Sequence, residues 1–183
     1  MITHETWKQA QARAREMIEK AAIGITDEEA NSVEIADFGL GHLEIEGAQI
    51  LTLVSTARLA VKVIVLFPGQ IEPEHWHPPV GDDPGKEETL RVVSGTVHVF
   101  IEGGDRPDST ALPKESRAYY TAGRMCTLST AQQLTIEPGV KHWFQSGELG
   151  AVMYSFSTVA RDSLDCFSDP RIVRRTKVGG GED

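Results

Sequence analysis

The chain has 183 residues, of which 40% are hydrophobic and 25% are charged, a composition typical of one globular domain with its own core. Its formal net charge of −9 argues against general binding to nucleic acids or anionic membranes, because both need a basic surface. No apolar stretch reaches the roughly 20 residues of a membrane span, and the N-terminus lacks a secretory pattern. With only Cys126 and Cys166 and no disulfide framework, we expect a cytoplasmic protein.

The first elements expected along the chain are two helices. Apolar residues recur at helical spacing over residues 6–22, and charged residues fill the opposite side. Gly24 ends this segment, and Thr26 with Glu29 forms a capping-box pattern for a second, short helix. The mixed charge and modest apolar stripe favour packing on the domain itself over binding at a membrane surface.

From Val33 onward, short apolar runs separated by glycine and proline replace the helical pattern and predict strands. A hairpin turn is expected at Gly95, because glycine adopts positive φ angles readily. Many short strands with close turns favour a sandwich or a barrel over alternating βαβ units. The expected strands cover residues 50–54, 60–67, 89–93, 96–101, 132–136 and 151–159.

These patterns divide one domain into three segments. Residues 1–32 form a helical segment packed on a barrel, residues 33–160 form the barrel, and residues 161–183 form a C-terminal extension that ends in a frayed tail. Two longer loops are expected within the barrel, at residues 78–87 and at about 103–117.

A histidine pair carries the strongest chemical signal. Residues two apart on an extended chain point the same way, so His75 and His77 would aim both imidazoles at one point. Neutral imidazole is a common ligand of divalent transition metals. An acidic residue, Glu88, opens a later strand, and His142 follows a Pro-Gly turn downstream.

The spacing of these residues resembles the two conserved cupin motifs. Five residues lie between Gly69 and the histidine pair, six lie between Glu88 and Gly95, and Pro138-Gly139 leads to the late histidine. The resemblance implies a cupin double-stranded β-helix, or jelly-roll barrel, with N-terminal α-helices. It also implies a metal site, whose ligands are His75, His77, Glu88 and His142.

Ten residues separate the histidine pair from the acid, where cupins usually have three or four, so we expect an inserted loop. That loop leaves Glu87 and Glu88 as alternatives, and the six-residue step to Gly95 selects Glu88. Other histidines, His4, His42 and His98, are not expected to bind metal. Both Trp76 and Trp143 neighbour a ligand, so each is a candidate substrate-binding residue or an ordinary packing residue.

A closer similarity extends from the N-terminal helix to about Arg174. The segments that carry it are Asp37-Phe38-Gly39-Leu40, Pro73-Glu74-His75-Trp76-His77-Pro78-Pro79, Gly85-Lys86-Glu87-Glu88-Thr89, His142-Trp143-Phe144-Gln145-Ser146-Gly147 and Phe167-Ser168-Asp169-Pro170-Arg171. They resemble the D-lyxose ketol-isomerase family. Its members interconvert a free aldose and its 2-ketose, D-lyxose and D-xylulose, and related members convert D-mannose to D-fructose.

This resemblance implies a reaction through a cis-enediolate held on a divalent metal, most simply manganese, with zinc, iron, cobalt and nickel as alternatives. It assigns catalytic roles to Lys86 and Glu88. Cupins also commonly pair through their sheets, which implies a homodimer.

One position departs from the family pattern. Ser155 stands where the family carries a glutamate, and serine is a poor base at neutral pH. If another carboxylate moves the proton, Asp162 and Glu74 are the first candidates, although Glu74 should point away from His75 on a strand. Two other functions therefore stay open, another metal-dependent cupin enzyme such as a dioxygenase, and a non-catalytic sugar-binding cupin.

Overall fold

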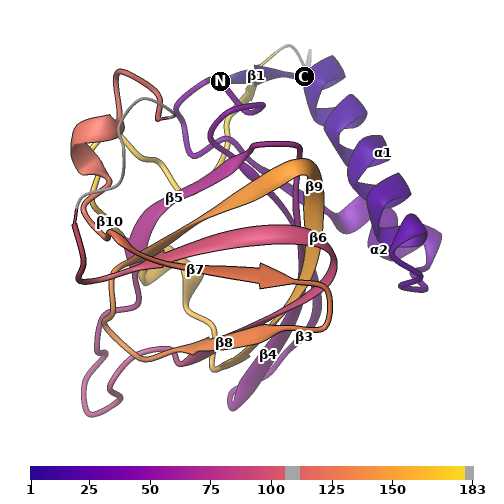
Figure 1. Ribbon diagram of the computed structural model, residues 1–183. Coiled ribbons are helices and arrows are strands. Elements are labelled where there is room, and N and C mark those ends of the chain that lie inside the picture. The colour runs from indigo at the N-terminus through magenta and orange to yellow at the C-terminus, as the bar shows by residue number, and fades with distance from the viewer. Residues whose placement is uncertain (106–111, 180–183) are drawn as a thin grey trace.

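The computed structural model describes residues 1–105 and 112–179 and shows two helices packed on one side of a curled β-sheet (Figure 1). Helix α1 (His4–Lys20) buries Ala14 and Ile18, while α2 (Asp27–Ser32) follows after a short turn. The expected capping box is confirmed, since the Thr26 hydroxyl accepts from the backbone N–H of Glu29 and the Glu29 carboxylate accepts from that of Thr26.

One nine-stranded sheet holds strands β2 to β10. Its main path runs β10-β5-β9-β4-β3-β2, and β6 pairs with β7, β8 and β9, so the sheet curls around its interior in the manner of a jelly roll. The predicted cupin fold is confirmed. The strands are β2 (Glu34–Ala36), β3 (Ala48–Ser55), β4 (Leu59–Leu66), β5 (Ile71–Trp76), β6 (Glu88–Ile101), β7 (Arg124–Ser129), β8 (Gln133–Ile136), β9 (His142–Thr158) and β10 (Cys166–Phe167).

The long strand β9 separates two apolar layers. Val152 and Tyr154 face the layer beneath the helices, whereas Met153 lies in the barrel interior and Ser155 points to Glu88. This alternation follows from the two-residue period of a strand. The barrel interior therefore receives every second side chain of β9, including those next to the histidine cluster.

The expected hairpin at Gly95 is wrong. Strand β6 continues through this position, and its register against β9 shifts on both sides of the glycine. Gly95 has a φ of +83°, and a Cβ there would lie 2.1 Å from the carbonyl oxygen of Gly150. The positive φ serves a bulge where two backbones touch, because a bulge needs the same glycine freedom as a turn.

The C-terminal extension returns to the barrel. A 3₁₀ turn (Asp162–Leu164) leads into β10, which pairs antiparallel with β5. Further on, β11 (Val178–Gly179) pairs in parallel with β1 (Ile2–Thr3) at the N-terminus. The rest of the expected frayed tail, residues 180–183, lies outside the described part of the chain, as do residues 106–111 of the second expected loop.

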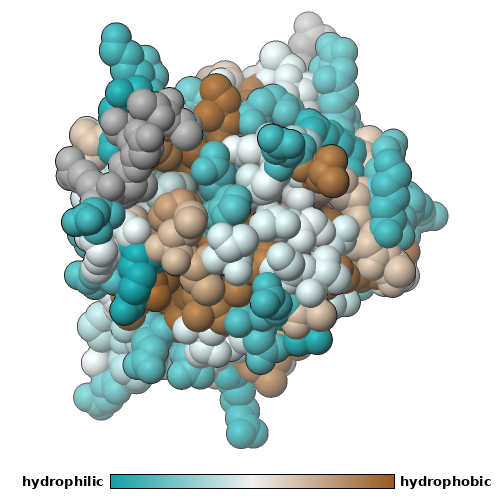
Figure 2. All heavy atoms as spheres, viewed as in Figure 1, coloured by the Kyte–Doolittle hydropathy of each residue, from teal (hydrophilic) through white to brown (hydrophobic). Residues whose placement is uncertain are grey.

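On the face seen in Figure 2, hydrophobic residues occupy small separate areas between hydrophilic ones. Within residues 1–105 and 112–179, no helix combines the length and the hydropathy that crossing a membrane requires.

Candidate metal centre and its cavity

The four expected ligands converge inside the barrel. His75 on β5 pairs directly with His142 at the start of β9, His77 follows β5, and Glu88 opens β6. Their ligand atoms all lie within 4.8 Å of one another. None of the four residues is more than 4% exposed. The site is thus a buried group of three imidazoles and one carboxylate that could hold a metal ion.

Hydrogen bonds on the far ring nitrogens orient the imidazoles. The Nδ1 atoms of His75 and His142 lie 2.8 Å from the carbonyl oxygens of Pro73 and Val140, which can only accept. Both histidines therefore carry the proton on Nδ1, which leaves the Nε2 lone pairs for a cation. The Nε2 atom of His142 is buried without a partner. This orphaned nitrogen and the mixed N/O donor set fit a divalent cation.

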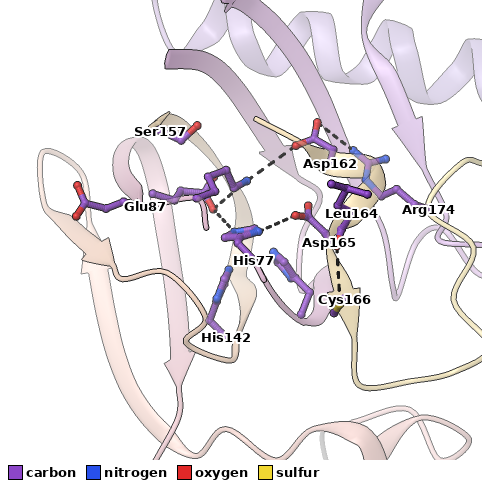
Figure 3. Close-up of polar contacts among 12 residues, drawn as sticks. His77, Glu87, His142, Ser157, Asp162, Leu164, Asp165, Cys166 and Arg174 are labelled. Atoms are coloured by element: carbon purple, nitrogen blue, oxygen red, sulfur yellow. Dashed lines mark hydrogen bonds and ion pairs between the residues drawn. The ribbon is translucent and has the colours of Figure 1, made fainter. Parts of the chain in front are cut away.

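The third imidazole is held between two carboxylates. His77 places Nδ1 2.8 Å from Oδ1 of Asp165 and Nε2 3.2 Å from Oε2 of Glu88 (Figure 3). Burial would lower the pKa of His77, but hydrogen bonds to Asp165 and Glu88 raise it above its usual value. Because metal ligands bind in the deprotonated form, a cation at Nε2 would displace this proton.

Glu88 rather than Glu87 faces the histidines. Its carboxylate is buried, accepts a hydrogen bond from the Ser155 hydroxyl, and lies 3.6 Å from the Nζ of Lys86. Glu87 is exposed, and its side chain points away from the cluster (Figure 3). Adjacent strand residues face opposite sides, so only one of the two acids can look inward.

The charges of the cluster are set by burial and by each other. Burial, His142 and His77 hold the pKa of His75 well below its usual value. Burial and the nearby His77 lower the pKa of His142 to about 4. Burial opposes the charge on Glu88, but Lys86 and His77 outweigh it and hold the pKa of that carboxyl well below its usual range. Burial would also lower the pKa of Lys86, but the neighbouring carboxylates, Glu88 first, raise it.

A cavity with a strongly polar wall adjoins the cluster. Apolar side chains from β3, β4 and β9 form part of its lining. Charged side chains come from the strands and also from the C-terminal extension. Lys62 forms an ion pair with Asp162, which also lies 3.9 Å from Arg174. The charged lining residues other than Glu88 are Lys62, Glu72, Lys86, Asp162, Asp165 and Arg174.

Comparison with known proteins decides the family. The chain is 46% identical to a D-lyxose/D-mannose isomerase of Thermosediminibacter oceani over 179 residues, which cover 97% of this chain and 99% of the relative. It is also 46% identical to a D-lyxose ketol-isomerase of Cohnella laeviribosi, over 92% of this chain and 93% of that one. The chain belongs to the D-lyxose ketol-isomerase family. No protein-family model matches it.

Solved structures similar to this family member share its fold at low identity. The L-ribose isomerase of Acinetobacter sp. DL28, as the mutant E204Q in complex with L-ribose, superposes with a TM-score of 0.80 at 16% identity. That match covers 97% of this chain and 98% of the other. The L-ribose isomerase of Cellulomonas parahominis with L-ribose gives the same TM-score at 15% identity and the same coverage. The whole chain therefore has the fold of these isomerases.

In this D-lyxose ketol-isomerase family member, Trp76 and Trp143, the two candidate substrate-binding tryptophans, do not line the cavity. Trp143 is 1% exposed, stacks on Phe100 with ring centroids 3.7 Å apart, and donates its indole N–H to the carbonyl of Ala122. Trp76 is half-buried, with the Nζ of Lys141 5.1 Å from its ring centroid. Both rings alternate with inward-facing histidines, so the strand period directs them away from the cluster. The structure thus gives Trp143 the packing role.

The histidines expected to be uninvolved lie elsewhere. His98 on β6 hydrogen-bonds to the hydroxyl of Thr127 across β7, and His42 lies 3.4 Å from the Glu46 carboxylate. His4 opens α1 and is exposed. None of these three belongs to the metal-binding group found among the described residues.

The first two candidates for a base are both engaged elsewhere. Glu74 accepts hydrogen bonds from the backbone N–H groups of Thr121 and Ala122 and from the Ser168 hydroxyl, a structural role. Asp162 is paired with Lys62, and although burial opposes its charge, that lysine holds the pKa of the carboxyl below its usual range.

Four residues of the lining are not predicted by the sequence patterns. Asp165 and Arg174 come from the C-terminal extension, where no periodicity indicates which side chains face the barrel. Lys62 lies in an apolar strand and would be taken for a solvent-facing residue, yet it is only 6% exposed. Glu72 was missed because β5 does not keep its alternation between this residue and His75. The charge of Lys62 within a buried strand was the one available clue.

Proposed function

We propose that this chain interconverts D-lyxose and D-xylulose, and also D-mannose and D-fructose, with a divalent metal bound by His75, His77, Glu88 and His142. The observation that carries the proposal is the convergence of these four buried residues beside a polar cavity, in a chain 46% identical to named isomerases of these sugars.

The bound cation would supply Lewis-acid polarisation of the sugar carbonyl, which makes the neighbouring C–H bond more acidic. Manganese is the metal we favour, because a site of imidazole and carboxylate donors suits it, although zinc, iron, cobalt or nickel would also fit and availability decides among them. The chain's own residues position the sugar and move its protons.

Lys86 is the proposed proton donor to the sugar oxygens. Its ammonium is buried, 3.6 Å from Glu88 and 4.0 Å from Asp162. The raised pKa keeps it protonated at neutral pH. A charged ammonium beside the ligands can stabilise the negative charge that develops on a sugar oxygen and can protonate that oxygen.

The charged groups that line the cavity support binding of a free sugar. Lys62, Lys86 and Arg174 all line the cavity, and each has a carboxylate within 4.0 Å. Such pairs offer both donors and acceptors to hydroxyl groups, whereas a phosphate would need an uncompensated cation. The balanced wall therefore favours an uncharged polyhydroxy substrate over a sugar phosphate.

Incubation of the metal-loaded protein with a panel of pentoses and hexoses, followed by ketose analysis, tests the proposal. Ketose should form from D-lyxose and D-mannose, disappear with a chelator and return best with Mn²⁺. Oxygen consumption with Fe²⁺ would instead indicate a dioxygenase-like cupin. Sugar binding without any conversion would indicate a non-catalytic module.

Two further parts of the proposal concern the location of the protein and its oligomeric state. A cytoplasmic location accords with two unpaired cysteines, Cys126 and Cys166, which suit a reducing compartment. The homodimer stays a prediction, which light scattering of the purified protein tests.

A further inference from the structure

A bulge in β5 turns Glu72 into the cavity. Glu72 lies opposite Phe144, and His75 lies opposite His142. From the first pair to the second, the chain advances three residues along β5 but only two along β9. His142 and Phe144 are two apart on β9 and face the barrel interior together. Their partners Glu72 and His75 therefore also face inward, although an unbroken strand would place them on opposite sides.

Glu72 differs from the other acids of this cavity in its hydrogen bonding. It is 8% exposed, and its Oε2 atom is buried without a hydrogen-bond partner. The other acids lining the cavity each have a partner: Glu88 bonds to Ser155 and His77, Asp162 to Lys62, and Asp165 to His77. A buried carboxylate without partners is costly, which points to a function that needs it free.

Building on the proposed function, we propose that Glu72 is the catalytic residue that moves the proton between C1 and C2 of the sugar. Glu72 takes the proton from C2 of the aldose, the C2–H electron pair forms a C1=C2 bond, and the carbonyl π pair moves to O1. Lys86 gives O1 a proton. In the second half, Lys86 regains a proton from the O2 hydroxyl, the C2 carbonyl forms, and the C1=C2 pair takes the proton back from Glu72 at C1.

Both side chains end in their starting states, and nothing is oxidised or reduced beyond the sugar itself. Ser155 does not fill this role, because its hydroxyl donates to Oε1 of Glu88 and serine is a poor base at neutral pH.

The electrostatics of the cavity suit a base that works at neutral pH. Burial first, and the nearby Glu88 second, raise the pKa of Glu72 to about 7, against the opposing charges of Arg174, Lys86 and Lys62. A general base is most effective when its pKa lies near the working pH, because it is then both ionised and basic. The acids Asp162 and Asp165 also face this cavity.

Steady-state kinetics of Glu72→Gln with D-lyxose test the inference, with metal content measured in the same samples. The kcat should fall by about 10²–10⁴-fold, the usual contribution of a positioned base, while the metal content stays that of the wild type. Glu72→Asp should retain part of the activity, and added formate should partly restore Glu72→Ala. The matched control is Glu87→Gln, which changes an exposed acid outside the cavity and should leave kcat unchanged.

Wild-type kcat in Glu72→Gln would overturn the inference and leave the proposed function intact. Equal losses in the Gln and Asp variants, with no rescue by formate, would also overturn it and assign Glu72 a structural role. A wild-type protein that converts no sugar would refute the proposed function first, and this inference would fall with it.

Discussion

At the scale of single residues, the three ligand histidines owe their orientation to Nδ1 hydrogen bonds with the carbonyl oxygens of Pro73 and Val140 and with the carboxylate of Asp165. Replacing His77 with alanine removes one ligand and leaves Glu88 and Asp165 without their shared partner. Metal content by elemental analysis should then drop from one ion per chain to near zero.

The control for this prediction is His98→Ala. His98 lies on the same strand as Glu88 but bonds to Thr127 outside the cluster, so this variant should keep its metal. Unchanged metal content in His77→Ala would exclude that residue as a ligand.

The adjacent acids Glu87 and Glu88 give a second test. Glu88→Gln should lose metal because it removes the carboxylate ligand, and it should also remove the strongest of the charges that raise the pKa of Lys86. Glu87→Gln should bind metal normally, since its side chain points to solvent (Figure 3). Isothermal titration with Mn²⁺ distinguishes the two, and a reversed result would mean that Glu87 turns inward.

The pH dependence of kcat/KM follows from the raised pKa of Glu72. Only the carboxylate form accepts a proton, so activity should rise with pH through the pKa of about 7 and fall about tenfold per unit below it. A bound cation would lower this pKa, which places the rise at pH 7 or below. Metal content is verified at each pH, and a rise centred above pH 8 would contradict the prediction.

At the scale of elements, two glycines allow the cost of a positive φ angle to be measured apart from the cost of a steric clash. Gly69 and Gly95 have φ angles of +70° and +83°, but a Cβ at Gly69 would meet nothing within 4 Å. Alanine at Gly69 should cost about 1–2 kcal/mol of unfolding free energy, the usual cost of a left-handed residue. Alanine at Gly95 should cost about 1–3 kcal/mol more, because its Cβ would collide with the backbone of Gly150.

Urea denaturation of the metal-free variants measures both changes. Equal losses at the two positions would mean that the β6–β9 crossing can relax around the added methyl group, and that Gly95 is needed only for its φ angle.

The elements also explain how far the sequence could be read. The strand period predicted that His75 and His77 share a face, and the resemblance to the cupin motifs implied that Glu88 and His142 join them. The same period fails at the β5 bulge, since one extra residue reverses every later side chain, and so Glu72 escaped notice. The hairpin predicted at Gly95 is a bulge, because turns and bulges both use a glycine with positive φ.

No strand or helix period predicts which side chains of the C-terminal extension face the cavity. Asp165 and Arg174 reach the cavity from a segment with little regular structure. Their placement depends on long-range pairing, such as that of β10 with β5, which no local pattern encodes.

At the scale of the whole molecule, the helices cover one side of the barrel (Figure 1). The C-terminal extension adds Asp162, Asp165 and Arg174 to the lining of the cavity. The barrel thus brings three histidines, one glutamate and a charged wall from distant parts of the chain into one buried site. The proposed ligands, proton carriers and sugar-binding groups all depend on the same curled sheet.

Titration of chelator-treated protein with Mn²⁺, with conversion of D-lyxose to D-xylulose followed by NMR, tests this most directly. Ketose formation should be absent at first, rise in proportion to added metal and level off at one ion per chain. Full activity before any metal is added, or no ketose at saturating metal, would contradict a metal-dependent isomerase built on His75, His77, Glu88 and His142.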